Sequence, residues 1–235
     1  MTSLSVIARM QSVFPTKFGI PRQSGLVQTL RSRIVFEPEF RNPDALRGLN
    51  EFSHIWLIWG FSGAAQKTWS PTVRPPRLGG NTRMGVFATR SPFRPNGMGL
   101  SSVCIDGIDL QTPDGPVIDV LGADLMDGTP IYDIKPYLPY TDSHPDAAGG
   151  FASGAPAPKL RVDIGDPLLA QLPEAQRKPL LDVLAQDPRP PYQEDPNRVY
   201  GMAFAGFEIQ FRVLDDAVSI VRLARIQQEE NSGSI

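Results

Sequence analysis

The residues that most clearly suggest a functional site are basic side chains clustered in one part of the chain. Between Glu51 and Asp106 there is no acidic residue, yet this stretch holds Lys67, Arg74, Arg77, Arg83, Arg90 and Arg94. The arginines stand among Gly, Pro and Asn, which places them on loops rather than on a helix. Because the planar guanidinium group pairs well with phosphate and carboxylate oxygens, the stretch indicates an anion site. A solvated basic face is the alternative.

The overall charge shows how local this cluster is. The whole chain of 235 residues has 23 basic and 25 acidic residues and a net charge of −2. The basic stretch carries +6, so 17 basic and 25 acidic residues, or −8, remain for the rest. This balance argues against a protein coated in basic residues for nucleic acid, and it favours a local site.

The motif with the most specific composition is ATRSPFRPNGMGLSSV, residues 88–103. Arg90 and Arg94 lie four residues apart, are interrupted by prolines, and are followed by Asn96, Gly97 and Gly99. This composition predicts a stiff loop whose backbone approaches another group closely. A purely structural turn rarely needs two arginines at its bends.

Several familiar site patterns are excluded. Residues 117–128, VIDVLGADLMDG, resemble the glycine loop of doubly wound nucleotide-binding folds, but only Gly122 is in place and no helix-forming sequence follows Asp127. The chain also lacks P-loop, HExxH and CxxC patterns, so no metal site is expected. His54 lies in an apolar segment and is expected to be a core histidine rather than a base.

Short segments rich in β-branched and aromatic residues surround these motifs and predict strands. They lie at 4–14, 33–37, 54–61, 84–89 and 100–110, and the segment 54–61 (HIWLIWGF) is predicted to be fully buried. Thr112-Pro113-Asp114-Gly115 predicts a hairpin turn. Residues 42–52 predict a short helix with Asn42 as its N-cap. The segment 62–82 is predicted to be a long irregular loop, which is usually functional or disordered.

The composition changes after residue 143. Residues 144–158 are rich in Gly, Ala and Pro and predict a linker. We therefore divide the chain into a strand-dominated domain (1–145), a linker (146–158) and a small α+β appendage (159–235). Prolines at 167, 173 and 179 predict two short helices that meet near Pro179. Three strands should follow as an antiparallel meander, with a turn at Asp215-Asp216.

The compartment is indicated by the cysteine content and by the hydropathy pattern. Cys104 is the single cysteine, so no internal disulfide is possible, as is typical of a reducing compartment. No apolar run approaches the roughly 20 residues that span a bilayer. The first residues also lack the pattern of a signal peptide. A cytoplasmic protein without a membrane span is expected.

Five segments carry a resemblance to a known family: IPRQSG, RPPRLGGN, FATRSPFRPN, DGTPIYDIKPYLP and AQDPRPPY. In them the chain closely resembles the TsaA-like family, the tRNA threonylcarbamoyladenosine methyltransferases (TrmO), and the resemblance extends from residue 1 to about 225. It implies an antiparallel β-barrel that forms a homodimer and binds S-adenosylmethionine near the subunit interface. The implied reaction is methyl transfer to N6 of N6-threonylcarbamoyladenosine, beside the anticodon of tRNA.

By position, the resemblance assigns the cofactor contacts to Pro21, Arg22, Gln23, Arg90, Leu100, Asp124, Leu125, Met126 and Asp127. Relatives carry a His-Gln pair after the buried strand, where this chain has Ser62 and Gly63, so contacts there would come from the backbone. The residue types suit the cofactor, because an arginine can bind its carboxylate and aspartates can lie near its ribose and sulfonium groups.

The resemblance also directs attention to YDIKPY, residues 132–137. The acceptor nitrogen is conjugated and poorly nucleophilic, so a base would help the transfer. Asp133 or Tyr137 is the candidate base, and Lys135 is the candidate partner of the threonyl carboxylate. A strand-ending turn with a surface lysine is the alternative. Contacts to RNA are expected from Arg74, Arg77, Arg83, Arg94 and Arg189.

Two other classes of function remain open. A non-catalytic β-barrel RNA-binding protein would predict exposed aromatic residues on strands, and it would not need the acidic segment 124–127. A small-molecule methyltransferase would not need the basic loop or Arg189. Binding of S-adenosylmethionine without RNA, and RNA binding that weakens steeply with salt, would separate the three hypotheses.

Overall fold

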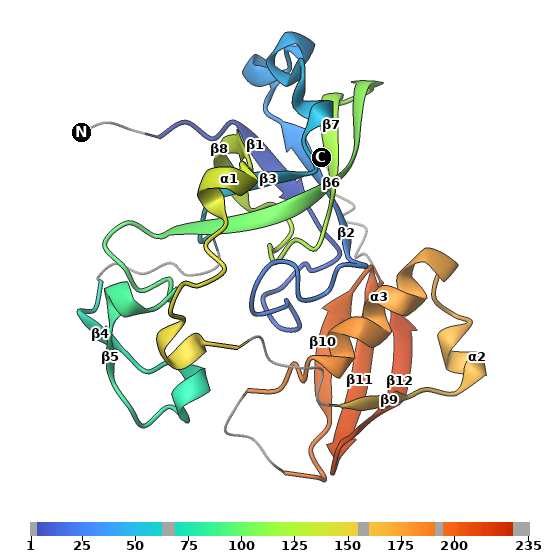
Figure 1. Cartoon of the computed structure of the whole chain (residues 1–235). Coiled ribbons are helices and arrows are strands. Elements are labelled where there is room, and N and C mark those ends of the chain that lie inside the picture. The colour runs from blue at the N-terminus through green and yellow to red at the C-terminus, as the bar shows by residue number, and fades with distance from the viewer. Residues whose placement is uncertain (1–3, 63–68, 155–159, 191–194, 228–235) are drawn as a thin grey trace, which may run out of the picture.

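The computed structural model describes residues 4–62, 69–154, 160–190 and 195–227. Six antiparallel strands form a closed barrel in the order β1-β2-β7-β6-β3-β8 (Figure 1). This arrangement confirms the mainly β fold and the antiparallel barrel. The strands are β1 Ala8–Gln11, β2 Arg31–Phe36, β3 His54–Gly60, β6 Met98–Thr112, β7 Gly115–Leu121 and β8 Pro130–Pro136.

Strand β3 lies between β6 and β8 and shows how the barrel sorts its side chains. Ile55 and Leu57 are fully buried, whereas Trp56 and Ile58, which follow them in turn, are only half-buried. Successive side chains of a strand point to opposite faces, so only every second residue of HIWLIWGF faces the interior. The expected fully buried strand is therefore wrong in detail. His54 is exposed at the start of the strand, and the expected core histidine is also wrong.

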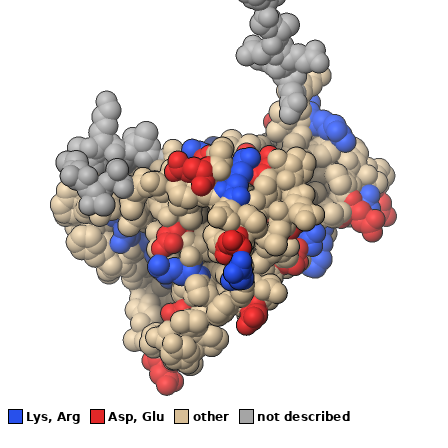
Figure 2. Space-filling view, turned by 90° about the horizontal axis from the view of Figure 1, so that it is seen from above, with Lys and Arg blue, Asp and Glu red and all other residues tan. Residues whose placement is uncertain are grey.

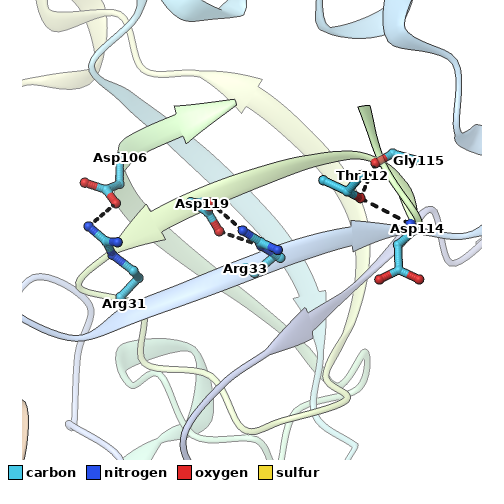
Figure 3. Close-up of polar contacts among 7 residues, drawn as sticks. All are labelled: Arg31, Arg33, Asp106, Thr112, Asp114, Gly115 and Asp119. Atoms are coloured by element: carbon cyan, nitrogen blue, oxygen red, sulfur yellow. Dashed lines mark hydrogen bonds and ion pairs between the residues drawn. The ribbon is translucent and has the colours of Figure 1, made fainter. Parts of the chain in front are cut away.

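The hairpin from β6 to β7 follows the turn chemistry predicted for residues 112–115 (Figure 3). The hydroxyl of Thr112 donates to the Gly115 carbonyl at 2.6 Å and accepts from the Asp114 amide at 3.2 Å. Gly115 has a φ of +81°, which a residue without Cβ adopts at little cost.

Ion pairs join the outer surfaces of β2, β6 and β7 (Figure 3). Arg31 contacts Asp106 at 2.7 Å, and Arg33 donates two hydrogen bonds to Asp119 at 2.7 and 2.8 Å. The hydrogen bonds from Arg33 lower the pKa of Asp119, although partial burial acts against them. Such cross-strand pairs add modestly to the stability of the sheet.

Two predicted elements of the first half differ from the structure. The helix expected at 42–52 is two 3-10 helices, η2 Pro43–Leu46 and η3 Leu49–Glu51, because Gly48 between them has a left-handed φ of +83°. Asn42 does cap η2, accepting from the Asp44 amide. The strand expected at 84–89 is only β5 Met84–Gly85, paired with β4 Thr72–Val73. The other short elements are η1 Pro38–Phe40, η4 Pro76–Leu78, η5 Val86–Ala88, α1 Pro139–Asp142 and η6 Gly150–Ala152.

The appendage has a four-stranded sheet in the order β10-β11-β12-β9. The predicted meander is confirmed, with its turn at Asp215, and β9 adds to its edge in parallel. The expected helix break at Pro179 is wrong, since the break falls near Pro173 and Pro179 lies buried inside α3. Packing against the core outweighs the cost of a proline there. The elements are β9 Arg161–Asp163, α2 Asp166–Leu169, α3 Glu174–Ala185, β10 Tyr200–Phe204, β11 Phe207–Leu214 and β12 Ala217–Arg225.

The barrel and the appendage each have a hydrophobic core, but the chain is not divided cleanly between them. Phe14, Val27 and Leu30 lie between β1 and β2, yet their side chains are buried in the core of the appendage. The division into 1–145, 146–158 and 159–235 therefore stays a prediction. No helix within the described ranges is long and apolar enough to cross a membrane.

Candidate cofactor site at one end of the barrel

A chain of hydrogen bonds crosses from the barrel interior to the segment that follows β7. The indole N–H of Trp59 in β3 donates to the hydroxyl of Ser101 in β6 at 3.0 Å. That hydroxyl donates to Oδ1 of Asp124 at 2.6 Å. Ser101 is only 1% exposed and lies within β6, so its hydroxyl is held by the barrel wall. The carboxylate of Asp124 is therefore held in one orientation.

The electrostatics of Asp124 set it apart from the other aspartates. Burial raises its pKa above the usual range, and this effect exceeds the opposing effects of the Ser101 hydroxyl, the backbone amides and the charge of Arg90. A carboxyl group whose charge is penalised by burial is stabilised by a cationic partner. Such groups are enriched at functional sites.

Arg90 meets the loop that precedes β2. Its Nη1 donates to Oε1 of Gln23 at 2.5 Å, and the side-chain amide of Gln23 donates to the Arg22 carbonyl at 2.5 Å. Arg22 is exposed, whereas Pro21 is buried and anchors the segment. The structure thus brings together Gln23, Arg90 and Asp124, three predicted cofactor residues from separate parts of the chain.

Glycines allow the two loops to approach each other. Gly122 has a φ of +76°, and a Cβ atom there would lie 3.3 Å from the Gly25 Cα. The Gly25 amide donates to the Gly122 carbonyl at 2.8 Å. Gly122, which alone could not form a nucleotide-binding glycine loop, therefore allows segment 20–25 to pack closely against the residues that precede Asp124.

The remaining residues of the DLMD segment have different surroundings. Leu125 is 1% exposed and belongs to the barrel core, so only its backbone could face a ligand. The carbonyl of Met126 accepts from the Thr129 hydroxyl at 2.7 Å. Asp127 is exposed, and its Oδ1 accepts from the Ser12 amide at 2.9 Å. Asp127 thus helps to hold the end of β1.

Trp59 and Ser101 were not among the predicted site residues. One signal in the sequence pointed toward them, since the glycines of residues 97–99 indicated a close approach of the backbone. The approaching group is Trp59: a Cβ at Gly99 would lie 2.3 Å from its ring. Gly60 is constrained in the same way, because a Cβ there would lie 2.4 Å from the hydroxyl of Tyr132.

The candidate catalytic residues lie on the outer wall of the barrel. Lys135 Nζ contacts Asp133 Oδ2 at 2.8 Å, and the ring of Tyr137 packs against Trp56 at 5.6 Å between centroids. Ile58 pairs with both Asp133 and Leu100 across the sheet, so these two residues share one row. Leu100 is 51% exposed on this outer face. The outer row and Asp124 are therefore on different sides of the strand β6.

The candidate RNA contacts comprise three exposed arginines and two half-buried ones. Arg74, Arg77 and Arg83 are exposed; Arg77 donates to the Gly154 carbonyl, and Arg83 donates to the Thr72 hydroxyl at 2.9 Å. Arg94 donates to the Thr89 carbonyl at 3.0 Å, and Arg189 is paired with Asp187 at 2.8 Å. Ser62 is exposed, and Gly63 lies outside the described residues.

Figure 2 shows the charged side chains on one face of the molecule. Basic (blue) and acidic (red) residues lie side by side there, without a broad patch of one sign. That face therefore lacks the continuous basic surface that binding to a phosphate backbone favours. Within the described parts of the chain, no cluster of three or more His, Cys, Asp or Glu residues is arranged to hold a metal ion.

Comparisons with known proteins identify the family of the chain. The model of the tRNA-methyltransferase O N-terminal domain matches residues 9–143, and that of the TrmO C-terminal domain matches residues 157–226. A protein of Escherichia coli named tRNA (adenine(37)-N6)-methyltransferase is 40% identical over 225 residues, which cover 92% of this chain and 95% of the relative.

A Pseudomonas aeruginosa protein named putative S-adenosylmethionine-dependent methyltransferase RcsF is also 40% identical, over 92% of this chain and 97% of its own length. The crystal structure of TrmO from Pseudomonas aeruginosa superposes with a TM-score of 0.77 at 32% identity, covering 95% of this chain and 98% of that structure. Because both family models match in order and the relatives align along nearly their whole length, the chain belongs to the tRNA-methyltransferase O (TrmO) family.

Proposed function

We propose that this protein is an S-adenosylmethionine-dependent methyltransferase that acts on N6 of N6-threonylcarbamoyladenosine next to the anticodon of tRNA. Membership of the TrmO family and the name of the Escherichia coli relative support the reaction and the class of substrate. The observation that carries the proposal is the partly buried carboxylate of Asp124, which is oriented by Ser101 and influenced by the charge of Arg90.

The groups at this end of the barrel fit S-adenosylmethionine. The guanidinium of Arg90 suits the carboxylate of the cofactor, and the buried carboxylate of Asp124 suits a cationic or hydroxyl-bearing group. Gln23 offers an amide that can both donate and accept. When bound, the cofactor supplies an electrophilic methyl group, and the protein must hold that group in line with the acceptor nitrogen. Ser101 and Trp59 contribute by fixing the carboxylate of Asp124.

The acceptor nitrogen carries a proton that must leave, so a base near it would help the transfer. We assign this role to Asp133 or Tyr137 on β8. The ammonium group of Lys135 contacts Oδ2 of Asp133 at 2.8 Å, so the candidate base and the candidate carboxylate partner lie side by side. The ammonium group of Lys135 can in turn face the threonyl carboxylate of the substrate.

We also propose that the protein acts as a homodimer. Asp124 and the row formed by Leu100 and Asp133 lie on different sides of β6. A cofactor bound to a single surface of one chain would therefore not contact both. Met98 and Leu100 are 37% and 51% exposed on β6, and Phe93 just before it is also exposed. A second copy that covered these apolar side chains would place a cofactor near the interface within reach of both groups.

For contacts to tRNA we propose Arg74, Arg77 and Arg83, which are exposed around β4 and β5. Arg94 and Arg189 are half-buried and donate to protein acceptors, as Arg77 and Arg83 also do, so each would contact RNA with the hydrogens that remain. Among the described residues, the largely exposed aromatic side chains Trp69, Phe87, Phe93 and Tyr140 lie outside the strands. This distribution does not support a non-catalytic module that stacks bases on its strands.

We place the protein in the cytoplasm. Cys104, the single cysteine of the chain, is a free thiol, which is compatible with a reducing compartment. The tRNA substrate of the proposed reaction supports the same location.

The direct test is methylation of purified tRNA. The protein is incubated with isotopically labelled S-adenosylmethionine and tRNA that contains N6-threonylcarbamoyladenosine, and the nucleosides are analysed by mass spectrometry. Label is expected on that nucleoside. Matched tRNA without the threonylcarbamoyl group should stay unlabelled, because Lys135 would then face no carboxylate. Equal labelling of both tRNAs would refute the proposed substrate.

A further inference from the structure

Residues 12–30, which connect β1 to β2, lie between the barrel and the appendage (Figure 1). Their backbone is bonded to the barrel segment that contains the proposed cofactor aspartates. The Gly25 amide donates to the Gly122 carbonyl at 2.8 Å, and the Gly122 amide donates to the Leu30 carbonyl at 2.9 Å. The Asp127 amide donates to the Phe14 carbonyl at 2.9 Å. One side of this connection is therefore part of the cofactor end of the barrel.

The apolar side chains of the same connection are buried in the appendage. Phe14, Val27 and Leu30 are at most 2% exposed and share a core with α3 and with β10–β12. Phe14 packs edge-on against Phe204 of β10 with ring centroids 5.6 Å apart. The Ala205 amide also donates to the Val13 carbonyl at 2.8 Å. The connection thus has backbone partners in both the barrel and the appendage, and its buried apolar side chains pack in the core of the appendage.

Helix α3 adds a polar contact at the far end of this connection. The hydroxyl of Thr29 donates to Oδ2 of Asp182 at 2.6 Å. Asp182 also accepts from Lys178 at 3.0 Å, one helical turn earlier. Hydrogen bonds to charged groups are stronger than those between neutral groups, so this contact restrains the residues that precede β2.

A second carboxylate lies just beyond α3, toward Arg22. Burial alone would raise the pKa of Asp187, but two hydrogen bonds and the charge of Arg189, together with the charge of Arg22, lower it overall. Asp187 also has a φ of +53°, an uncommon conformation for a residue with a side chain. The appendage therefore contacts the connection of residues 12–30, here called the cofactor loop, at Thr29, and the charge of Arg22 on the same loop acts on Asp187.

We infer that α3 of the appendage is a positioning element for the cofactor loop, with Thr29 and Asp182 as its positioning residues. This inference rests on the proposed function, because it takes Arg22 and Gln23 as cofactor contacts. Packing and the bond from Thr29 hold the loop in the conformation in which Gln23 meets Arg90. Cofactor affinity and the structure of the appendage are then thermodynamically coupled.

The test compares four variants of the full-length protein by calorimetric titration with S-adenosylmethionine. Thr29→Val removes the hydroxyl donor and should weaken binding by about tenfold, the size of one lost charge-assisted hydrogen bond. Asp182→Asn can still accept from Thr29 but without its charge, so it should weaken binding less. Thr29→Ser keeps the hydroxyl and should bind with wild-type affinity. Lys178→Gln removes the other partner of Asp182 and should leave affinity unchanged. In steady-state kinetics, Thr29→Val should raise the KM for the cofactor but not the KM for tRNA.

The outcomes separate this inference from the proposed function. Failure of the wild-type protein to bind S-adenosylmethionine would refute the proposed function. If the wild type binds and both Thr29→Val and Asp182→Asn bind equally well as folded proteins, the positioning role is refuted. Circular dichroism and thermal unfolding establish that each variant is folded. Asp182→Asn is the less disruptive change, because its side chain is 32% exposed.

Discussion

The hydroxyl of Ser101 donates a 2.6 Å hydrogen bond to Oδ1 of Asp124 and so connects the barrel interior to the proposed cofactor site. The two residues are 23 positions apart and lie on β6 and on the segment after β7. This bond orients a carboxylate whose charged form is otherwise penalised by burial. The ionised carboxylate of Asp124 should therefore lower the free energy of unfolding and strengthen the binding of a cation, and both effects can be measured.

Asp124→Asn should stabilise the free protein and weaken cofactor binding. Since burial raises the pKa of Asp124, the ionised group costs stability once the pH rises above its unfolded-state pKa of about 3.9 and through the higher folded-state value. Asparagine can still accept from Ser101 but avoids this cost. Denaturant unfolding at pH 7 should show a gain of roughly 0.5–2 kcal/mol. The gain should shrink near pH 4, and a variant less stable than the wild type at pH 7 would contradict the account.

Ser101→Ala should leave the Trp59 N–H buried without its partner, at a cost of about 1–3 kcal/mol in unfolding free energy. Because the Ser101 hydroxyl lowers the pKa of Asp124, its loss should raise that pKa further. The pH at which cofactor binding sets in should then move upward in a titration series. Ser102→Ala, on the outer face of the same strand, is the matched control and should change neither quantity.

Gly99→Ala should destabilise the barrel by roughly 1–3 kcal/mol, because the added Cβ would overlap the ring of Trp59. Thermal and denaturant unfolding measure the effect. Gly97→Ala serves as the control, since a Cβ there meets nothing within 4 Å. Equal stability of the two variants would show that Trp59 can move away at little cost.

Arg90→Ala should weaken S-adenosylmethionine binding by about 10- to 100-fold, as expected for the loss of a charge-assisted contact. The protein should stay folded, because Arg90 is exposed and its side chain donates to Gln23 rather than to a core residue. Calorimetry checks the affinity. Arg47→Ala, which removes an exposed arginine paired with Asp44, should bind the cofactor normally. Unchanged affinity in the folded Arg90 variant would remove this residue from the proposed site.

Arg77→Ala should raise the KM for tRNA and leave cofactor affinity unchanged. Each lost phosphate contact should flatten the dependence of log affinity on log salt by about 0.7–0.9. Filter-binding measurements over a range of salt concentrations check this slope. Arg161→Ala, which removes an exposed arginine paired with Asp163 in the appendage, is the control. An unaltered slope for Arg77→Ala would place the RNA on another surface.

The features that the sequence by itself determined are those with a local cause. The period of apolar residues located most strands, and Thr112 and Gly115 predicted the hairpin because turn geometry depends on neighbouring residues. The motifs also indicated the family, and with it the barrel. Helix ends were less accurate: Gly48 divided one predicted helix, and Pro179 was accommodated inside another.

Only the tertiary structure decided which distant groups meet. Closure of the barrel joins Trp59, Ser101 and Asp124, and the appendage buries Phe14 although 190 residues separate it from Phe204. Neighbouring residues in the sequence predict neither contact, because the partners of a buried side chain depend on the shape and polarity of its surroundings in space. The contact of α3 with the cofactor loop was therefore visible only in the folded chain.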